Sequence, residues 1–289
     1  MSKENAEATR NGTPVYICFP ARKGGVGKTM LAGNTAGFLA NEGYRVLLVG
    51  ADSQEDVSEK YLSPLEDFDL DEHLTLSDIL DGTIAVEDAI VSTPKYKKFR
   101  FSEKTGKLRR IYTGNTYTFD IIPAGTDIDS RGGDELDVIR EYFSGIEENY
   151  DYILFDTPPA ETESFMLVLM ACDYAVIPVT DRASFKSVKN VLDDIELARD
   201  NGSRVRCLGI VVNNQHSTRS LDKFNEGIFR ESLDGAVFDT VIRSSSIIPN
   251  ADAFSLPVCS YMTKEGSCED LYRYFCELNE RISSMEKEI

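Results

Sequence analysis

Apolar runs of strand length alternate along the chain with longer stretches in which apolar residues recur at helical spacing. The pattern predicts strands over residues 15–19, 45–50, 119–124, 151–156, 174–179, 205–213 and 236–242. It predicts helices over residues 28–41, 134–148, 162–171, 184–200, 218–233 and 265–285. The strand runs are continuous in Val, Ile and Leu, which is typical of strands covered on both faces. The alternation therefore predicts a single α/β domain with a mostly parallel, twisted sheet and helices on both faces.

Residues 95–112 break this alternation. Two basic, β-rich runs flank a Thr-Gly pair, which predicts a basic β-hairpin inserted over about residues 92–118 and projecting from the body. Segment 92–119 carries eight Lys and Arg residues against one acid, Glu103, a net charge of +7. The whole chain carries −18, so the remainder carries −25. This acidity argues against wholesale wrapping of nucleic acid, whereas the basic segment calls for a partner of its own.

The remaining composition is that of an ordinary globular protein, with 42% hydrophobic and 28% charged residues. No run reaches eighteen apolar residues, and the first thirteen residues lack an apolar core, so neither a membrane span nor a secretory signal is expected. Residues 1–13 are expected to form a flexible tail, 14–285 the domain and 286–289 a short C-terminal end. Six cysteines without a CxxC pair suit reduced thiols of a cytoplasmic protein.

The strongest chemical signal is the sequence Arg-Lys-Gly-Gly-Val-Gly-Lys-Thr at residues 22–29, which follows the first predicted strand and opens a helix. Glycines allow successive backbone N–H groups to converge on an anion at a helix N-terminus. Lys28 is expected to reach the β- and γ-phosphates of a nucleotide, and the Thr29 hydroxyl to ligate Mg²⁺. Arg22 occupies the place of the first glycine of the usual P-loop pattern. The alternative, a glycine-rich turn with a chance Gly-Lys-Thr, does not account for the strand–loop–helix context.

Residues 23–29, KGGVGKT, resemble the deviant Walker A signature of the ParA/MinD group of ATPases. The resemblance extends over about residues 14–285. RVLLVGADSQ (45–54) is similar to the switch I segment of the group, and YDYILFDTPP (150–159) to its switch II segment. VFDTVIRSSSIIPNADAFSLPV (237–258) resembles a segment of ParA proper, so the chain is most similar to ParA (Soj-like) partition ATPases.

The resemblance implies ATP and Mg²⁺ as cofactors and an ATP-dependent sandwich homodimer. In such a dimer Lys23 reaches the partner's nucleotide, Asp52 positions the attacking water, and Asp156 holds the Mg²⁺ shell together with Thr29 and Asp52. Lys23, Lys28 and Asp52 are the implied catalytic residues. The implied nucleotide-binding residues are Lys23, Gly24, Gly25, Val26, Gly27, Lys28, Thr29, Met30 and Asn213, the last as a reader of adenine.

Three residues depart from the pattern of the group. Gly50 replaces the first Asp of a DxD pair, and Ser53 replaces a proline, which should loosen switch I. Met30 replaces a hydroxyl residue that would contact the α-phosphate. These departures leave ATP binding well supported and the rate of hydrolysis open.

The function implied is slow ATP hydrolysis that drives partition of plasmid or chromosomal DNA. The implied partners are non-specific DNA and a separately encoded centromere-binding or activating protein, with a nucleoid-associated location in the cytoplasm. The candidate DNA-binding residues are Lys97, Lys98, Arg100, Arg109, Arg110 and Arg219. Aromatic residues interleaved in the hairpin, Tyr96, Phe99, Phe101 and Tyr112, could stack on unpaired bases.

Other interpretations remain open. The hairpin could be a solvated arm or a dock for an acidic protein, and Arg219 a solvent-exposed residue at a helix start. The chain could also be a nucleotide-gated binding module, or a cargo-positioning ATPase, with vestigial hydrolysis. Membrane binding is disfavoured, because the apolar stripe of the last helix (Leu271, Tyr274, Phe275, Leu278, Ile282 and Met285) has a mixed polar face and predicts packing on the sheet.

Overall fold

The computed structural model describes residues 13–69, 72–104, 107–130, 138–160, 162–216, 219–233, 235–261 and 267–287. The tail predicted for residues 1–13 lies outside this part except for Thr13. The same is true of residues 288–289 of the predicted C-terminal end and of the Thr-Gly pair, 105–106, of the predicted hairpin.

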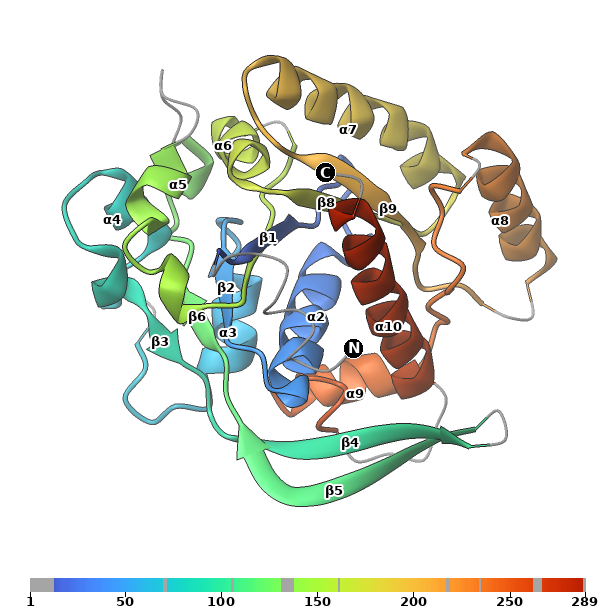
Figure 1. Cartoon of the computed structure of the whole chain (residues 1–289), viewed down its shortest axis with the longest axis horizontal. Coiled ribbons are helices and arrows are strands. Elements are labelled where there is room, and N and C mark those ends of the chain that lie inside the picture. Colours follow the sequence, from blue (N-terminus) through green and yellow to red (C-terminus); the bar gives the residue numbers. More distant parts are fainter. Residues whose placement is uncertain are drawn as a thin grey trace.

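A seven-stranded sheet forms the centre of the molecule, with strand order β3-β6-β2-β7-β1-β8-β9 (Figure 1). The strands are β1 (Val15–Cys18), β2 (Val46–Gly50), β3 (Val91–Ser92), β6 (Asp120–Ile122), β7 (Tyr152–Asp156), β8 (Tyr174–Val179) and β9 (Arg206–Val212). Only β3 pairs antiparallel to its neighbour, and all other pairs of this sheet are parallel. The prediction of one α/β domain with a mostly parallel sheet is therefore confirmed.

Residues 236–242, predicted to be a strand, form only an isolated bridge between Val237 and Ile210 of β9. The segment runs beside β9, but it leaves the ladder where the backbone N–H groups of Asp239 and Thr240 donate to the Glu277 carboxylate, at 2.8 and 2.9 Å. A side chain thus takes the backbone donors that a strand would have used.

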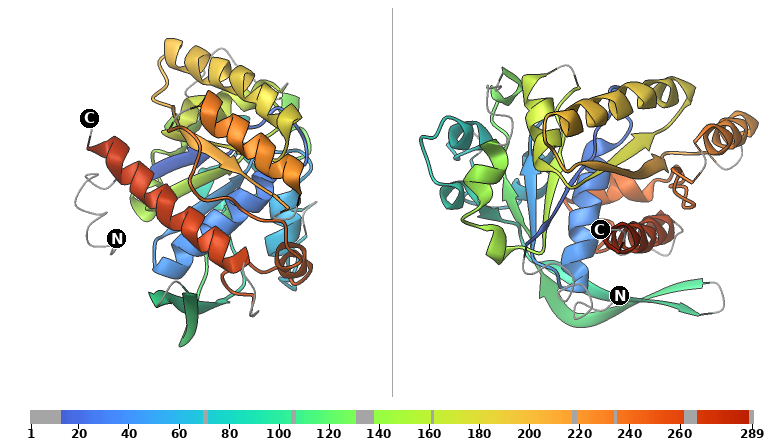
Figure 2. Two further views of the ribbon diagram at one scale, coloured as in Figure 1. Left: turned by 90° about the vertical axis from the view of Figure 1, so that its right-hand side faces the viewer. Right: turned by 45° about the horizontal axis from the view of Figure 1, so that its top comes forward.

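Helices cover both faces of the sheet (Figures 1 and 2). One face carries α2 (Lys28–Glu42), α3 (Asp56–Leu62), α9 (Ile247–Ala253) and α10 (Ser267–Glu286), whose apolar residues share one core. The other face carries α4 (Leu76–Leu80), α5 (Val138–Phe143), α6 (Glu163–Ala171), α7 (Arg182–Asp200) and the short 3₁₀ turns Val86–Ala89, Ile128–Ser130 and Glu147–Asn149. α8 (Ser220–Ser232) lies beyond β9, where its Phe229 stacks on Phe185 of α7.

Helix α2 is buried almost all round, from Leu31 to Asn41. The side that faces away from the sheet is covered by α10 and by the hairpin of β4 (Tyr96–Lys104) and β5 (Lys107–Tyr117). Two glycines let its neighbours approach closely: a Cβ at Gly33 would collide with the Tyr61 ring of α3, and one at Gly37 with Pro257. The helix ends at Gly43, whose φ of 101° lets its N–H turn back to Ala40 and Leu39.

The apolar stripe of α10 packs on this core, as predicted. Leu271, Tyr274, Phe275, Leu278 and Ile282 are all buried. Within the described residues, no helix combines the length and the apolar character needed to span a membrane.

Strands β4 (Tyr96–Lys104) and β5 (Lys107–Tyr117) pair antiparallel as a separate hairpin beneath α2 and α10 (Figures 1 and 2). The expectation that it projects with its aromatic rings available is wrong for one of its faces. Tyr96, Phe99 and Phe101 are buried, and Phe101 packs against Phe38 of α2 and Tyr272 of α10. The rings fill the gap between the two helices, so of these four aromatic residues only Tyr112, 48% exposed, remains open to a partner.

We expect the two faces of the hairpin to respond differently to truncation. Phe101→Ala removes a buried ring and should lower the free energy of unfolding by about 3 kcal/mol, whereas Ile111→Ala on the exposed face should change it by less than about 0.5 kcal/mol. Urea denaturation followed by circular dichroism measures both. Equal effects of the two substitutions would show that the hairpin does not belong to the core.

Candidate functional site

The segment between β1 and α2 forms a glycine-rich loop that ends at the helix N-terminus. Gly25 and Gly27 have φ of 72° and 98°, a left-handed backbone that favours glycine. A Cβ at Gly27 would also collide with the Asn213 amide. No side chain of the described residues caps α2 at Gly27. The first N–H groups of the helix therefore suit an anion.

A cleft of about 550 Å³ opens above this loop. Loop residues form one wall, and the segment after β2, through α3, forms the opposite one. The lining residues are Gly24, Gly25, Gly27, Lys28, Thr29, Met30, Asp52, Gln54, Asp56, Lys60, Pro159 and Asp252. The structure thus brings Lys28, Thr29, Met30 and Asp52 together as predicted site residues, and Lys28 Nζ lies 3.7 Å from Asp52 Oδ2.

Two acidic residues of α7 and its cap hold the start of the loop. Arg22 forms a forked ion pair with Asp194, at 2.6 and 3.1 Å. The Lys23 ammonium lies 2.5 Å from Asp181 Oδ2 and holds the pKa of Asp181 down, at about 2. The arginine in place of a glycine therefore ties the loop to α7. The Lys23 side chain is 41% exposed, so its ion pair is weak and can be exchanged for another.

Asp156, at the end of β7, lies behind the loop and is 1% exposed. Burial raises the pKa of its carboxyl from 3.8 to about 7, against the opposing effects of a hydrogen bond from Thr29 and the charge of Lys28. Its Oδ1 is buried without a hydrogen-bond partner. A buried carboxylate oxygen without a donor is costly and suits a cation, so Thr29 and Asp156 fit Mg²⁺.

The described residues contain no group of three or more His, Cys, Asp or Glu arranged to hold a metal ion. Mg²⁺ commonly binds proteins through one or two side chains together with substrate phosphates and water. The two oxygen ligands here are compatible with that mode of binding.

The segment after β2 is held at two points, although Ser53 in place of a proline is expected to loosen it. The Ser53 hydroxyl donates to Asp129 Oδ2 at 2.5 Å. The Glu55 carboxylate accepts the N–H of Gly125 at 2.5 Å. No motif in the sequence indicates either interaction, because the partners lie 76 and 70 residues away along the chain.

Asn213 lies beneath the loop and is buried. Its Nδ2 donates to the Val26 carbonyl at 2.8 Å, and its Oδ1 accepts the N–H of Asn214 at 2.8 Å. The Nδ2 end of the amide therefore braces the loop, and the Oδ1 end is held by the neighbouring backbone. The role of Asn213 as a reader of adenine stays a prediction.

Sequence reasoning missed Lys60 and Asp252, which form an ion pair at the edge of the cleft and join α3 to α9. The Lys60 side chain is 11% exposed, and its ammonium lies 4.9 Å from the centre of the Tyr61 ring. The sequence shows only an acid, Asp252, and a base, Lys60, on short segments far apart, and this does not indicate that they pair.

The candidate DNA-binding residues of the hairpin fall into three groups. Lys97, Arg100 and Arg109 are exposed on the outer face of the hairpin. Arg110 instead donates to the Tyr261 carbonyl at 2.6 Å and lies over the Phe99 ring. Lys98 is half-buried beside Glu42. Burial raises the pKa of Glu42, and the charge of Lys98 partly opposes this rise.

Arg219, at the start of α8, is exposed, and α8 lies away from the hairpin (Figures 1 and 2). The hairpin meets the C-terminal end of α2 at Asn41, whereas the loop lies at its N-terminal end. Fifteen helical residues separate those ends by roughly 22 Å. The structure therefore does not bring the hairpin, Arg219 and the cleft together.

The fold and the loop define a P-loop nucleotide-binding protein, and comparison with known proteins agrees. The model of the AAA domain family matches residues 15–205, and the chain belongs to this family as a ParA/MinD-type P-loop ATPase. It is 28% identical to the chromosome partitioning protein ParA of Caulobacter vibrioides over 256 residues, covering 84% of this chain and 85% of that protein.

Two solved structures have a similar fold. The first is the ATP complex of a McdA variant from Cyanothece, with a TM-score of 0.71 and 16% identity over 94% of this chain and 97% of that one. The second is a plasmid partition protein from Borrelia burgdorferi bound to AMPPNP, with a TM-score of 0.68 and 16% identity over 94% and 99%.

The raised pKa of Asp156 predicts a pH-dependent stability in the metal-free, nucleotide-free protein. A folded pKa above the unfolded one stabilises the protonated folded state. This contribution is therefore complete below about pH 4 and is lost as the pH rises through about 7. Asp156→Asn should remove up to about 1.4 kcal/mol per pH unit of this loss. Urea denaturation at several pH values with a chelator tests it, with Asp67→Asn, at an exposed position, as the control. Identical pH profiles of wild type and Asp156→Asn would contradict the prediction.

Proposed function

We propose that the chain is a Mg²⁺- and ATP-dependent ParA-like ATPase that dimerises around nucleotide, binds DNA non-specifically and drives DNA partition with a separately encoded activating protein. The observation that carries the proposal is the convergence of Lys28, Thr29 and the N-terminus of α2 on one cleft, with the unpartnered Asp156 oxygen behind them. The similarity to a chromosome partitioning protein, and to structures described with ATP or AMPPNP, supports it.

The side chains divide the work of hydrolysis between binding and orientation. Lys28 and the N–H groups of the loop hold the phosphates, where they offset negative charge. Thr29 and Asp156 would hold Mg²⁺, which supplies further charge compensation when it is bound. Asp52, 3.7 Å from Lys28, lies across the cleft from the loop, where its carboxylate can orient a water for attack on the terminal phosphate.

Lys23 takes no part in the cleft of its own chain, because it pairs with Asp181. In the proposed dimer it exchanges this exposed carboxylate for a phosphate of the nucleotide bound to the partner. The exchange leaves the Asp181 carboxylate without Lys23, at little cost because the Asp181 side chain is 47% exposed to solvent. ADP, which lacks the terminal phosphate, should leave the dimer weak.

Two lysines of the loop should therefore give different phenotypes. Lys28→Ala should weaken ATP binding about 10- to 100-fold, because it removes charged hydrogen bonds to phosphate. Lys23→Ala should bind ATP within about threefold of wild type yet remain monomeric, because the substitution removes only the ion pair across the interface. Fluorescent-nucleotide titration and light scattering with ATP and ADP measure the two properties, with Lys189→Ala, an exposed lysine of α7, as the control. An ATP-bound Lys23→Ala dimer as stable as that of wild type would refute this role.

DNA binding should depend on ATP and on clustered exposed cations rather than on base sequence. Replacing Lys97, Arg100 and Arg109 together by Ala tests the hairpin, and Arg219→Ala tests the start of α8. Whichever variant removes cations that bind DNA should reduce the slope of log K against log salt by about 0.9 for each phosphate that is no longer neutralised. Binding assays with non-specific duplex DNA at several salt concentrations, with Lys189→Ala as control, measure the effect. Wild-type protein that dimerises with ATP but binds no duplex would refute the DNA-partition proposal.

The position of the hairpin favours one second candidate, an ATPase that positions cargo through a protein partner. Its exposed face combines Lys97, Arg100 and Arg109 with the apolar Ile111 and lies at the end of α2 remote from the cleft. Surfaces of mixed cationic and apolar character suit an acidic protein segment. The DNA-binding assay separates the two candidates, because only the first requires duplex binding.

A further inference from the structure

Glu55 has an uncommon backbone and an uncommon environment for a charged residue. Its φ is 59°, in the left-handed region that side chains other than those of Gly, Asn and Asp rarely adopt. The residue is acidic and yet only 7% exposed, although acids are seldom buried unless they are paired. Both features cost free energy, so a specific interaction must offset them.

The interaction is with two consecutive backbone N–H groups just beyond β6. Glu55 Oε1 accepts the N–H of Gly125 at 2.5 Å, and Oε2 accepts that of Ala124 at 3.3 Å. Gly125 has φ of 89°, which turns its N–H toward the same carboxylate. Successive N–H groups that converge in this way bind anions well. The start of α3 is thereby fixed to the end of β6.

This interaction fixes Asp52, because the two residues belong to one turn. The N–H of Glu55 donates to the Asp52 carbonyl at 3.0 Å, and the N–H of Gln54 to Asp52 Oδ1 at 3.1 Å. Ser53, between them, donates to Asp129. Residues 52–55 are thus tied to the segment 124–129 at two points, and the Asp52 carboxylate is held on the cleft side, near Lys28.

A side chain at residue 50 would meet one of the amides that Glu55 uses, the N–H of Ala124. A Cβ at residue 50 would lie 3.2 Å from the Ala124 nitrogen and 3.5 Å from its Cβ. A carboxylate on residue 50 would therefore reach the N–H that Glu55 Oε2 accepts. Two carboxylates competing for one amide would repel each other, so residues 50 and 55 offer alternative positions for one acid.

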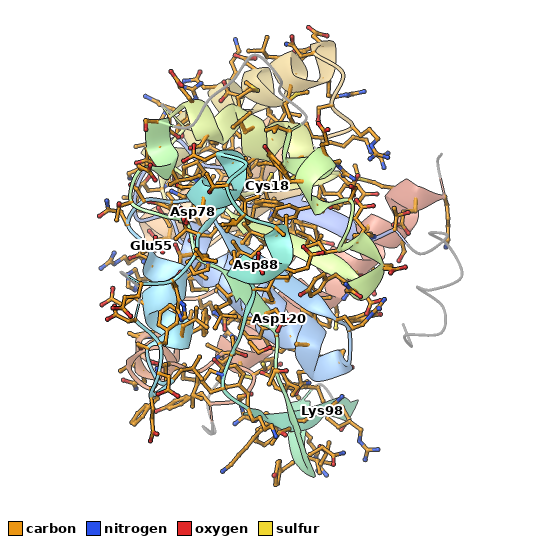
Figure 3. The ribbon with its side chains drawn as sticks, turned by 90° about the vertical axis from the view of Figure 1, so that its left-hand side faces the viewer. Cys18, Glu55, Asp78, Asp88, Lys98 and Asp120 are labelled. Carbon is orange, nitrogen blue, oxygen red and sulfur yellow. The ribbon has the colours of Figure 1, made fainter. Side chains whose placement is uncertain are left out.

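We propose that Glu55 is a positioning residue: its carboxylate binds the amides of Ala124 and Gly125, the first of which a side chain at residue 50 would also meet, and holds the Asp52 turn against the end of β6 for catalysis. Figure 3 labels Glu55 on the body of the molecule and Lys98 on the hairpin. The catalytic part of the proposal rests on the proposed ATPase function, whereas the anchoring part does not.

The test moves the acid between the two positions. Glu55→Gly removes the carboxylate and leaves a residue that adopts φ of 59° without strain, so backbone conformation is not disturbed. Gly50→Asp alone places two carboxylates at one amide, and the double variant Gly50→Asp/Glu55→Gly relocates one. Glu66→Gln, at an exposed position after α3, is the matched control. Each variant is assayed as the full chain for amide hydrogen exchange without nucleotide, ATP affinity, and phosphate release under single-turnover conditions.

Glu55→Gly and Gly50→Asp should each slow phosphate release about tenfold or more with ATP affinity within about threefold, because the substitutions misplace the Asp52 turn and leave the nucleotide bound. In Glu55→Gly the amides of Ala124 and Gly125 should exchange about tenfold faster. The double variant should recover most of both properties. If Glu55 had only a structural role, its loss would lower stability, but it would not slow phosphate release while leaving ATP affinity unchanged. The double variant would then not recover activity.

Three results would overturn the inference. They are unchanged exchange at Ala124 and Gly125 in Glu55→Gly, unchanged phosphate release in that variant, and a double variant no better than Glu55→Gly. If the wild type releases no phosphate, the proposed ATPase function fails. Hydrogen exchange at Ala124 and Gly125, compared between the wild type and the variants at residues 50 and 55, then still decides whether Glu55 anchors the turn.

Discussion

Close packing of α2 on all sides is the constraint on which the rest of the structure depends. Its N-terminus carries the glycine-rich loop, and Gly33 brings Tyr61 of α3 against it. One turn further, Gly37 admits Pro257, and Asn34 accepts the N–H of Val258 at 2.8 Å. At its last turn Asn41 accepts the N–H of Phe99 at 2.8 Å and donates to its carbonyl at 2.7 Å. The loop, one wall of the cleft and the hairpin are therefore placed relative to one another by a single helix.

Charged interactions around the cleft act at its edges, where solvent weakens them, and in its interior, where burial strengthens them. Arg22 and Lys23 pair with acids of α7 and its cap, and Lys60 with Asp252 of α9. The Lys23–Asp181 pair, whose side chains are 41% and 47% exposed, adds little stability and can be exchanged at low cost. Asp156, by contrast, is fully buried, so a change in its charge alters the free energy of the folded state. The site thus combines a replaceable ion pair at its edge, Lys23–Asp181, with one buried carboxyl behind the loop, Asp156, whose ionisation is costly.

The sequence allowed most of the sheet and the position of the loop residues to be predicted, because both depend on local patterns. Buried strands are continuous apolar runs, and the loop is a contiguous motif, so β1, α2, Lys28, Thr29 and Asp156 were found where their patterns placed them. Helices α3, α4 and α9 were missed because none exceeds seven residues, too short for a helical period to show. Pairing across long separations was also invisible: nothing in the order of residues indicates that Glu55 meets Gly125, or that the aromatic face of the hairpin turns inward.

The hairpin anchored at the far end of α2 has a consequence for valency. In a dimer that closes over its two clefts, the hairpins of the two copies lie at opposite outer ends, because each is separated from its own cleft by the length of α2. Such a dimer presents two remote binding faces, whereas the monomer presents one. A partner array with repeated sites would then be held by avidity that exists only while nucleotide keeps the copies together, and one weak interaction per face would suffice for retention.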